Sequence, residues 1–340
     1  MLKFIKRERL YILMLLFIVA INVMNAGHRE KAQLEEKKPL SAMTLKEIGV
    51  TEEKVKDFFE SGKLNAGFFK YSIILGFFIF VAALISNLGF FFQRKKIDLR
   101  PNPNKGTVSW GISDLVKASI IIIFAAYLVG LIEALLVRTV RLELGLNLHM
   151  MLSTFFIDII VLAVVLYFVV VRSRERLQAL GLRFKSILNN ILSGMAAYIF
   201  IVPLLFIVLV FSIWFLDLLG YTPPPQPVFE VFMEEERSRV LFFLTIFVSL
   251  FGPIVEEIFF RGFMYSAIKK RLGFLGAAFL SASIFSLLHA NIVSFLPIMM
   301  LGALLAYLYE RTGSLVAPIT VHMVHNSVIV GFMFFIKELI

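Results

Sequence analysis

Long apolar runs with few charged residues recur along the whole chain, and they constrain its fold more than any other feature. A helix needs about 20 largely apolar residues to cross the hydrocarbon core of a bilayer. About nine such windows occur, of which the seventh and eighth are short and close together. They cover residues 10–24, 68–92, 115–136, 150–171, 187–216, 240–260, 274–289, 292–309 and 316–336. With 59% hydrophobic residues, the chain has more apolar surface than a soluble domain of 340 residues can bury. The sequence therefore predicts an all-α polytopic membrane protein with about nine transmembrane helices.

The net charge of +10 is concentrated in short segments between these runs. Lys and Arg gather in residues 3–9, 94–105, 172–185 and 269–271, with Arg311 further on. All of these segments fall on one side if every run crosses the membrane once. The positive-inside rule makes that side cytoplasmic, so we expect a multi-pass cell-membrane protein with a cytoplasmic N-terminus. This explanation of the charge leaves no reason to expect a nucleic-acid partner.

The polar segments divide the chain into four parts. Residues 1–27 predict an uncleaved N-terminal signal anchor, and residues 28–66 form a polar segment of mixed charge that we expect outside the cytoplasm. Residues 67–220 form a transmembrane framework, and a proline-rich loop separates it from residues 239–337. The chain has no cysteine, which excludes disulfides, thiolate metal ligands and a cysteine nucleophile.

Residues 239–337 carry polar side chains where a membrane helix should have none. Glu256 and Glu257 lie side by side in an apolar run. A charged group near the bilayer centre costs roughly 3 kcal/mol, so acids in such a position indicate a functional site. Later runs carry His289 and the segment from His322 to Asn326, which together hold three of the five histidines of the chain.

Helical geometry indicates how these clusters meet. Glu257 and Arg261 are four residues apart, so they share a helix face and can form an ion pair, whereas Glu256 points about 100° away. A helical hairpin that turns near residue 273 returns His289 to about the depth of Glu256, which makes His289 the expected partner of Glu256. His322 and Asn326 also share a face, but the same arithmetic puts His322 nearer the cytoplasm than Glu256.

These clusters carry a resemblance to a known family. The segments EEIFFR (256–261), FSLLH (285–289) and HMVHN (322–326) match, in order, the EExxxR, FxxxH and HxxxN motifs. The chain thus resembles the CPBP intramembrane metalloproteases, the CAAX protease and bacteriocin-processing family. This family includes the type II CAAX prenyl endopeptidases and the Ras-converting endopeptidase. The resemblance covers about the last hundred residues, and three motifs in order make it fairly specific.

The resemblance implies that residues 239–337 form a four-helix protease core. Glu256 and His289 would hold and deprotonate a water molecule, and His322 and Asn326 would donate hydrogen bonds to the developing oxyanion. Glu257 and Arg261 would shape the site in a supporting role. No cofactor is favoured, since the chain has no HExxH motif. If zinc were used, Glu256, His289 and His322 would be its ligands.

The implied reaction is glutamate-dependent hydrolysis of a peptide bond in a membrane-bound or lipidated protein or peptide. It would serve CAAX-type C-terminal processing or the processing of a bacteriocin leader. The first alternative is a non-enzymatic immunity or scaffold protein of the same fold. A less favoured alternative is a proton-coupled transporter that uses Glu133, Asp158 and Glu256 as a relay. We interpret Glu133 and Asp158 as structural, because neither belongs to a motif.

Overall fold

The computed structural model describes residues 2–32, 48–93, 100, 107–140, 146–183, 186–221 and 226–340. Within these ranges the chain forms helices and no strands. Seven of the helices are long and apolar enough to cross a membrane, which confirms the all-α polytopic class. These spans are Leu64–Phe92, Ile112–Leu136, Leu148–Arg172, Ile187–Leu218, Ser238–Leu287, Ile292–Thr312 and Val316–Leu339.

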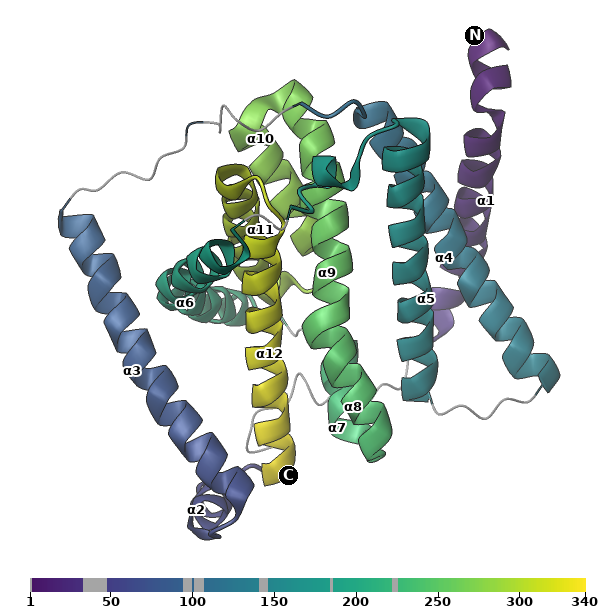
Figure 1. The fold of residues 1–340 in the computed structure, drawn as a ribbon. Helices are drawn as coiled ribbons and strands as arrows, with labels where there is room; N and C mark the ends of the chain where they lie inside the picture. The colour runs from purple at the N-terminus through teal and green to yellow at the C-terminus, as the bar shows by residue number, and fades with distance from the viewer. Residues whose placement is uncertain are drawn as a thin grey trace.

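Figure 1 labels the helices in chain order. The first half contains α1 (Leu2–Ala32), α2 (Glu52–Glu60), α3 (Leu64–Phe92), α4 (Ile112–Val140), α5 (Leu146–Leu166), the π-helix η2 (Tyr167–Arg172) and the 3₁₀-helix η3 (Leu177–Leu180). The second half contains α6 (Ile187–Leu218), α7 (Pro227–Glu234), α8 (Ser238–Ile246), η4 (Phe247–Phe251), α9 (Gly252–Glu257), η5 (Ile258–Tyr265), α10 (Ser266–Leu287), α11 (Ile292–Thr312) and α12 (Val316–Leu339). Both η4 and η5 are π-helical.

Two of the nine expected windows fall in one helical run. Residues 240–260 and 274–289 both lie in Ser238–Leu287, which is interrupted at Gly273 by backbone angles (φ 67°, ψ −171°) that are not helical. In Figure 1 the chain turns over within α10, so this run passes through the bundle twice. Glycine tolerates this positive φ without strain. The first window lies inside α1, and only part of it falls among the residues whose side chains are described.

The C-terminal helices occupy the middle of the molecule (Figure 1). Helix α10 packs on α11, and both α11 and α12 pack on α6. The contact with α6 is close at Gly194, where a Cβ atom would lie 2.8 Å from the carbonyl oxygen of Ala317. Small residues permit this kind of approach between membrane helices.

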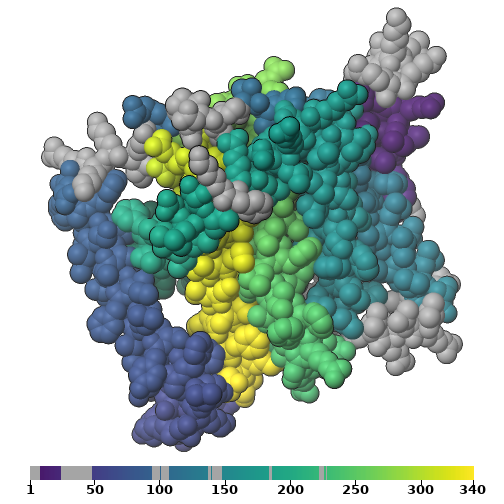
Figure 2. All heavy atoms as spheres, in the orientation of Figure 1, coloured from purple at the N-terminus to yellow at the C-terminus, as the bar shows by residue number. Residues whose placement is uncertain are grey.

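The outer helices flank this centre on both sides. Helix α4 packs against α1 and α5, and the Lys117 ammonium on α4 lies 2.8 Å from the Glu8 carboxylate on α1. On the opposite edge, α3 contacts α6, where the Asn87 amide donates to the carbonyl oxygen of Phe200. Figure 2 shows α2 and α3 as the outermost part of that edge.

The polar segment expected at residues 28–66 is mostly helical where it is described, with short non-helical stretches at residues 48–51 and 61–63. It contributes α2 and the first turn of α3, while residues 33–47 lie outside the described residues. Helix α2 meets the end of α12, where Lys54 Nζ donates to the carbonyl oxygen of Ile340 at 3.0 Å and the Asn65 amide donates to Glu338. This segment therefore holds the C-terminal end of the chain.

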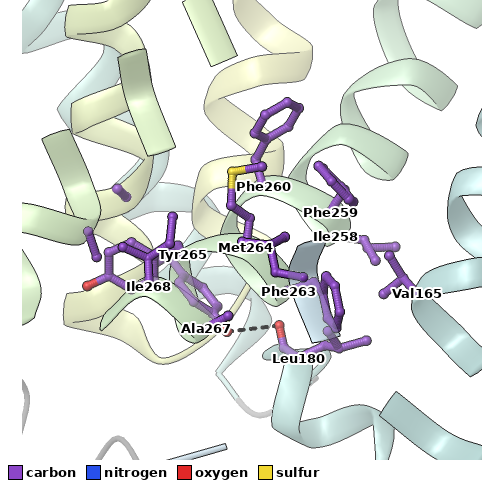
Figure 3. Close-up of a cluster of buried hydrophobic side chains, with 14 of the residues drawn as sticks. Val165, Leu180, Ile258, Phe259, Phe260, Phe263, Met264, Tyr265, Ala267 and Ile268 are labelled. Carbon is purple, nitrogen blue, oxygen red and sulfur yellow. Dashed lines mark hydrogen bonds between the residues drawn. The ribbon is translucent and has the colours of Figure 1, made fainter. Parts of the chain in front are cut away.

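The largest group of buried side chains surrounds η5. Figure 3 shows Phe263 of η5 beside Leu180 of η3 and Val165 of α5. The indole of Trp110 stacks on Phe263 with ring centroids 5.7 Å apart, and its N–H donates to the carbonyl oxygen of the same residue. Because η5 directly follows the two glutamates, this core holds the chain rigidly next to them.

A tight turn joins α10 to α11 at residues 288–291. The returning half of α10 has only 14 residues, from Phe274 to Leu287, and so extends about 21 Å. Ala290 adopts a positive φ of 51°, and the Asn291 side chain caps α11 by accepting from the N–H groups of Val293 and Ser294. The returning half of α10 is thus shorter than a hydrocarbon core of about 30 Å and does not cross it. His289 lies within the turn at its end.

Candidate active site

The two glutamates lie in a short α-helical segment between two π-helices. Helix α9, which ends at Glu257, is preceded by η4 and followed by η5. π-Helical segments inside α-helices are rare and are frequent at functional sites. They widen the helix locally, so side chains before and after α9 take directions that a regular helix would not give them.

Glu257 is held in a fully buried network. Its side chain and that of Arg261 are 0% and 1% exposed, and Glu257 Oε1 accepts from Arg261 Nη1 at 2.6 Å. Arg261 Nη2 also donates to the carbonyl oxygen of Gly302 at 3.3 Å. His322, which is 2% exposed, donates from Nδ1 to the same oxygen of Glu257 at 2.9 Å. The ion pair expected from the spacing of Glu257 and Arg261 is therefore present, and it also fixes the ring of His322.

Glu256 has a different environment from its neighbour. Its side chain is 35% exposed, and its Oε2 atom lies 3.7 Å from Nε2 of His322. This oxygen is buried, but it makes no hydrogen bond within the described part of the chain. The Glu257 carboxylate is therefore held by protein groups, whereas the Glu256 side chain is partly exposed and can meet a substrate or water.

His289 lies on the exposed α10–α11 turn. Its Nδ1 donates to the carbonyl oxygen of Phe285 at 2.8 Å, and its ring contacts the edge of the Phe285 ring at a centroid distance of 4.8 Å. Between the described residues Glu256 and His289 there is neither a hydrogen bond nor an ion pair. The structure thus brings Glu256 to His322 rather than to His289, its expected partner.

Phe285 joins the clusters from the centre of the site. The guanidinium carbon of Arg261 lies 4.4 Å from the centroid of its ring, within the range of a cation–π contact. The His322 ring contacts the same side chain at a centroid distance of 5.6 Å, and His289 follows one turn later. Phe285 opens the motif FSLLH, but side-chain spacing alone predicts no role for it. An aromatic ring four residues before His289 is the sequence signal for this contact.

Asn326 is anchored one turn beyond His322 on α12. Its amide nitrogen donates to the carbonyl oxygen of Val248 on η4 at 2.9 Å. The neighbouring His325 points to α6, where its Nδ1 lies 3.2 Å from the Tyr198 hydroxyl. The contact with Val248 was not predictable from side-chain spacing, since it involves a backbone group of a π-helix.

The remaining intramembrane acids have separate surroundings. The Ser153 hydroxyl donates to Glu133, and the cationic Lys117 on α4 pairs with Glu8. Asp158 on α5 lies within electrostatic range of Glu256. Asp158 is therefore near the site.

The residues named for zinc do not form a metal site in this conformation. In the parts of the chain that are described, no three His, Asp or Glu side chains gather closely enough to hold a metal ion. Nδ1 of His322 is engaged by Glu257, and Nδ1 of His289 is engaged by a backbone carbonyl, which leaves Nε2 of each ring as the possible metal ligand. Glu256, His289 and His322 are nevertheless not gathered around one point, so the zinc alternative stays a prediction.

Gly302 supplies a test of packing at the site. A Cβ atom at this position would lie 3.1 Å from the Ala282 Cβ atom and 3.3 Å from Nη2 of Arg261. We expect Gly302→Ala to lower the free energy of unfolding by about 1–3 kcal/mol, as overpacking does in other cores. Gly331→Ala is the matched control, since nothing lies within 4 Å of its added Cβ atom. Equal melting temperatures of the two variants in detergent would contradict the close contact at Gly302.

Comparisons with known proteins identify the same part of the chain. Residues 238–328 match the family model of type II CAAX prenyl endopeptidase Rce1-like proteins. YdiL, a candidate membrane peptidase of Bacillus subtilis (strain 168), is 31% identical over 110 residues, 30% of this chain and 45% of that protein. The membrane-embedded CAAX protease MroQ of Staphylococcus aureus (strain USA300) is 34% identical over 102 residues, 28% of this chain and 41% of that protein. No solved structure gives a significant match.

These matches cover the site and less than a third of the chain. The chain spans less than half the length of the curated relatives it matches. The matched range contains both glutamates, Arg261, His289 and the α12 pair His322 and Asn326. Residues 238–328 of this multi-pass membrane protein are therefore similar to the type II CAAX prenyl endopeptidase Rce1-like proteins.

Proposed function

We propose that the chain is an intramembrane endopeptidase that hydrolyses a peptide bond of a membrane-bound or lipidated protein or peptide. The observation that carries this proposal is the contrast between the two glutamates. Glu257 is fully buried, and its Oε1 accepts from Arg261 and His322, whereas the Glu256 side chain is 35% exposed and has no such partners among the described residues. A carboxylate of this kind can accept a proton from water.

In the proposed reaction, Glu256 takes a proton from water while the water oxygen attacks the carbonyl carbon of the scissile bond. The tetrahedral oxyanion then collapses, the C–N bond breaks, and Glu256 returns the proton to the leaving amine. The water oxygen ends in the new carboxyl group. His289 donates from Nδ1 to Phe285, so in its neutral form Nε2 keeps a lone pair with which it can help to orient the water.

We assign the stabilisation of the oxyanion to α12. Asn326 uses its amide nitrogen for Val248, but an amide carries two N–H groups, so one remains for the substrate. Nδ1 of His322 is held by Glu257, and Nε2 lies 3.7 Å from Glu256. In its protonated form the ring donates from both nitrogens, so Nε2 can then donate to the oxyanion. Preorganised donors of this type contribute about 3 kcal/mol each in hydrolases. Glu257 and Arg261 act as positioning residues, and we assign no step to a metal.

We further propose that the N-terminus and the turn of α10 face the cytoplasm. The two lie at the same end of the molecule in Figure 1. Basic residues precede the first apolar run, and Lys269, Lys270 and Arg271 precede the turn. The positive-inside rule supports this orientation.

The substrate class is tested by a panel of membrane peptides. Purified full-length protein would be given fluorogenic peptides with and without a prenyl group, including CAAX-type C-termini and leader-type sequences. We expect cleavage by the wild type, loss of cleavage in Glu256→Gln and His289→Ala, and no effect of a strong chelator. Chelator-sensitive cleavage would contradict the metal-free mechanism. If the wild type binds but cleaves none of the peptides, the non-enzymatic immunity or scaffold function takes precedence.

A further inference from the structure

A cavity of about 660 Å³, which neither Glu256 nor Glu257 lines, lies at the ends of several membrane spans. Arg174 and Arg176 line it and directly follow the span that ends at Arg172. Lys269 and Lys270 line it just before the turn at Gly273, and Gly313 follows the end of α11. The cavity therefore opens where the bundle meets the polar surface of the membrane, and we call it the interfacial pocket.

The interfacial pocket is rich in positive charge. Five cationic side chains line it, namely Arg174, Arg176, Arg183, Lys269 and Lys270, against one carboxylate, Glu175. Glu175 accepts from the Ser109 hydroxyl at 2.5 Å, and Lys269 pairs with Glu310 at 2.6 Å. Lys270 donates to the backbone carbonyls of Ser109 and Trp110, which do not neutralise its charge.

The three arginines of the interfacial pocket form no ion pair with a carboxylate in the part of the chain that the structure describes. The bond that involves the Arg183 side chain runs from Nε to the backbone carbonyl of Gln178. Arg174 and Arg176 are exposed, and no ion pair connects any of the three arginines to a described carboxylate. Guanidinium groups that line one cavity and form no ion pair with a protein carboxylate can form bidentate bonds with a phosphate.

The floor of the interfacial pocket is rigid and polar. Tyr309 is 1% exposed, and its hydroxyl donates to the carbonyl oxygen of Leu180 at 3.1 Å and lies 3.4 Å from the Ser266 hydroxyl. Gly181, at a φ of +86°, passes so close that a Cβ atom would lie 2.5 Å from the Tyr309 ring. The interfacial pocket therefore combines a rigid polar floor with cationic side chains at its rim, an arrangement that suits a bound anion.

We propose that the interfacial pocket binds a phosphate group. Its place at the ends of the spans makes the headgroup of an anionic phospholipid the natural source, and free inorganic phosphate is the second source with the same chemistry. Basic pockets between membrane helices hold anionic headgroups in this way. The site is separate from the proposed hydrolysis and does not depend on it.

Native mass spectrometry of the full chain in detergent tests the proposal. The protein would be titrated with short-chain phosphatidylglycerol, with phosphatidylcholine and, in a separate arm, with inorganic phosphate. We expect phosphatidylglycerol to bind about tenfold more tightly than phosphatidylcholine. The triple variant Arg174→Gln/Arg176→Gln/Arg183→Gln should reduce this preference to about twofold or less. The matched control Lys56→Gln/Lys63→Gln/Arg239→Gln removes three exposed cations elsewhere and should keep it.

The arms also separate the two sources of phosphate. Competition by millimolar phosphate against phosphatidylglycerol in the wild type supports a headgroup site. Binding of phosphate alone, lost in the triple variant, supports a site for the soluble anion. Equal binding of both lipids and no phosphate binding would overturn the proposal, as would a triple variant that binds like the wild type. The melting temperature of each variant without ligand shows whether it is folded. Added anion should raise that temperature where it binds, because a bound anion stabilises only the native state.

Discussion

Replacing Glu256 by glutamine is expected to lower the rate of peptide hydrolysis by about 10²–10⁴-fold, the usual contribution of a general base. Glutamine keeps the shape of the side chain but cannot take a proton from water. The variant should fold normally, because Oε2 of Glu256 makes no hydrogen bond within the described residues. Initial rates on the best-cleaved peptide, together with melting temperatures in detergent, measure the two effects separately.

Two further variants show that the loss is specific to Glu256. Glu60→Gln removes an exposed carboxylate from the last turn of α2 and should leave the rate unchanged. Glu257→Gln keeps an oxygen acceptor but removes the negative charge that pairs with the buried Arg261, so it should lower stability as well as activity. A Glu256→Gln enzyme that retains a tenth or more of the wild-type rate would exclude Glu256 as the base.

The largest loss of stability is expected from Arg261→Met. This change leaves the carboxylate of Glu257 fully buried without its cation, which typically costs about 3–5 kcal/mol. The methionine fills part of the same volume, so most of the effect arises from the uncompensated charge. Equilibrium unfolding in mixed micelles, followed by tryptophan fluorescence, measures it.

The double variant Arg261→Met/Glu257→Met separates charge from packing. Replacing both members of a buried ion pair by apolar residues is often neutral or stabilising. We therefore expect the double variant to be more stable than Arg261→Met alone, although His322 has lost its acceptor. Additive losses in this double-mutant cycle would show that the two side chains are not coupled.

The sequence predicted the class of fold and the ion pair of Glu257 and Arg261 for simple physical reasons. Apolar windows report the thickness of the membrane, and a spacing of four residues reports a shared helix face. The ion pair of Glu257 and Arg261 follows from the second rule and is present. The catalytic roles of Glu256, His289, His322 and Asn326 stay predictions until the variants are measured.

The pairing of Glu256 was harder to predict because it depends on features that lack a sequence signal. Depth along straight helices placed His289 opposite Glu256 and put His322 nearer the cytoplasm. The structure instead sets His322 against both glutamates, with π-helices on either side of α9. A π-helix changes both the rise and the direction of the side chains, so errors accumulate over a span. Likewise, the merging of two windows in Ser238–Leu287 depends on one backbone conformation, that of Gly273.

The half of α10 from Phe274 to Leu287 is short, and this determines how a hydrolase at this site would obtain water, its second reactant. Residues 288–291 are not helical, and non-helical backbone is not tolerated in contact with hydrocarbon. His289 and Ala290 are nevertheless exposed on the protein surface. Water must therefore reach this turn, and lipid must be kept from it. Water at the turn would lie beside Phe285, whose ring contacts Arg261 of the buried glutamate network.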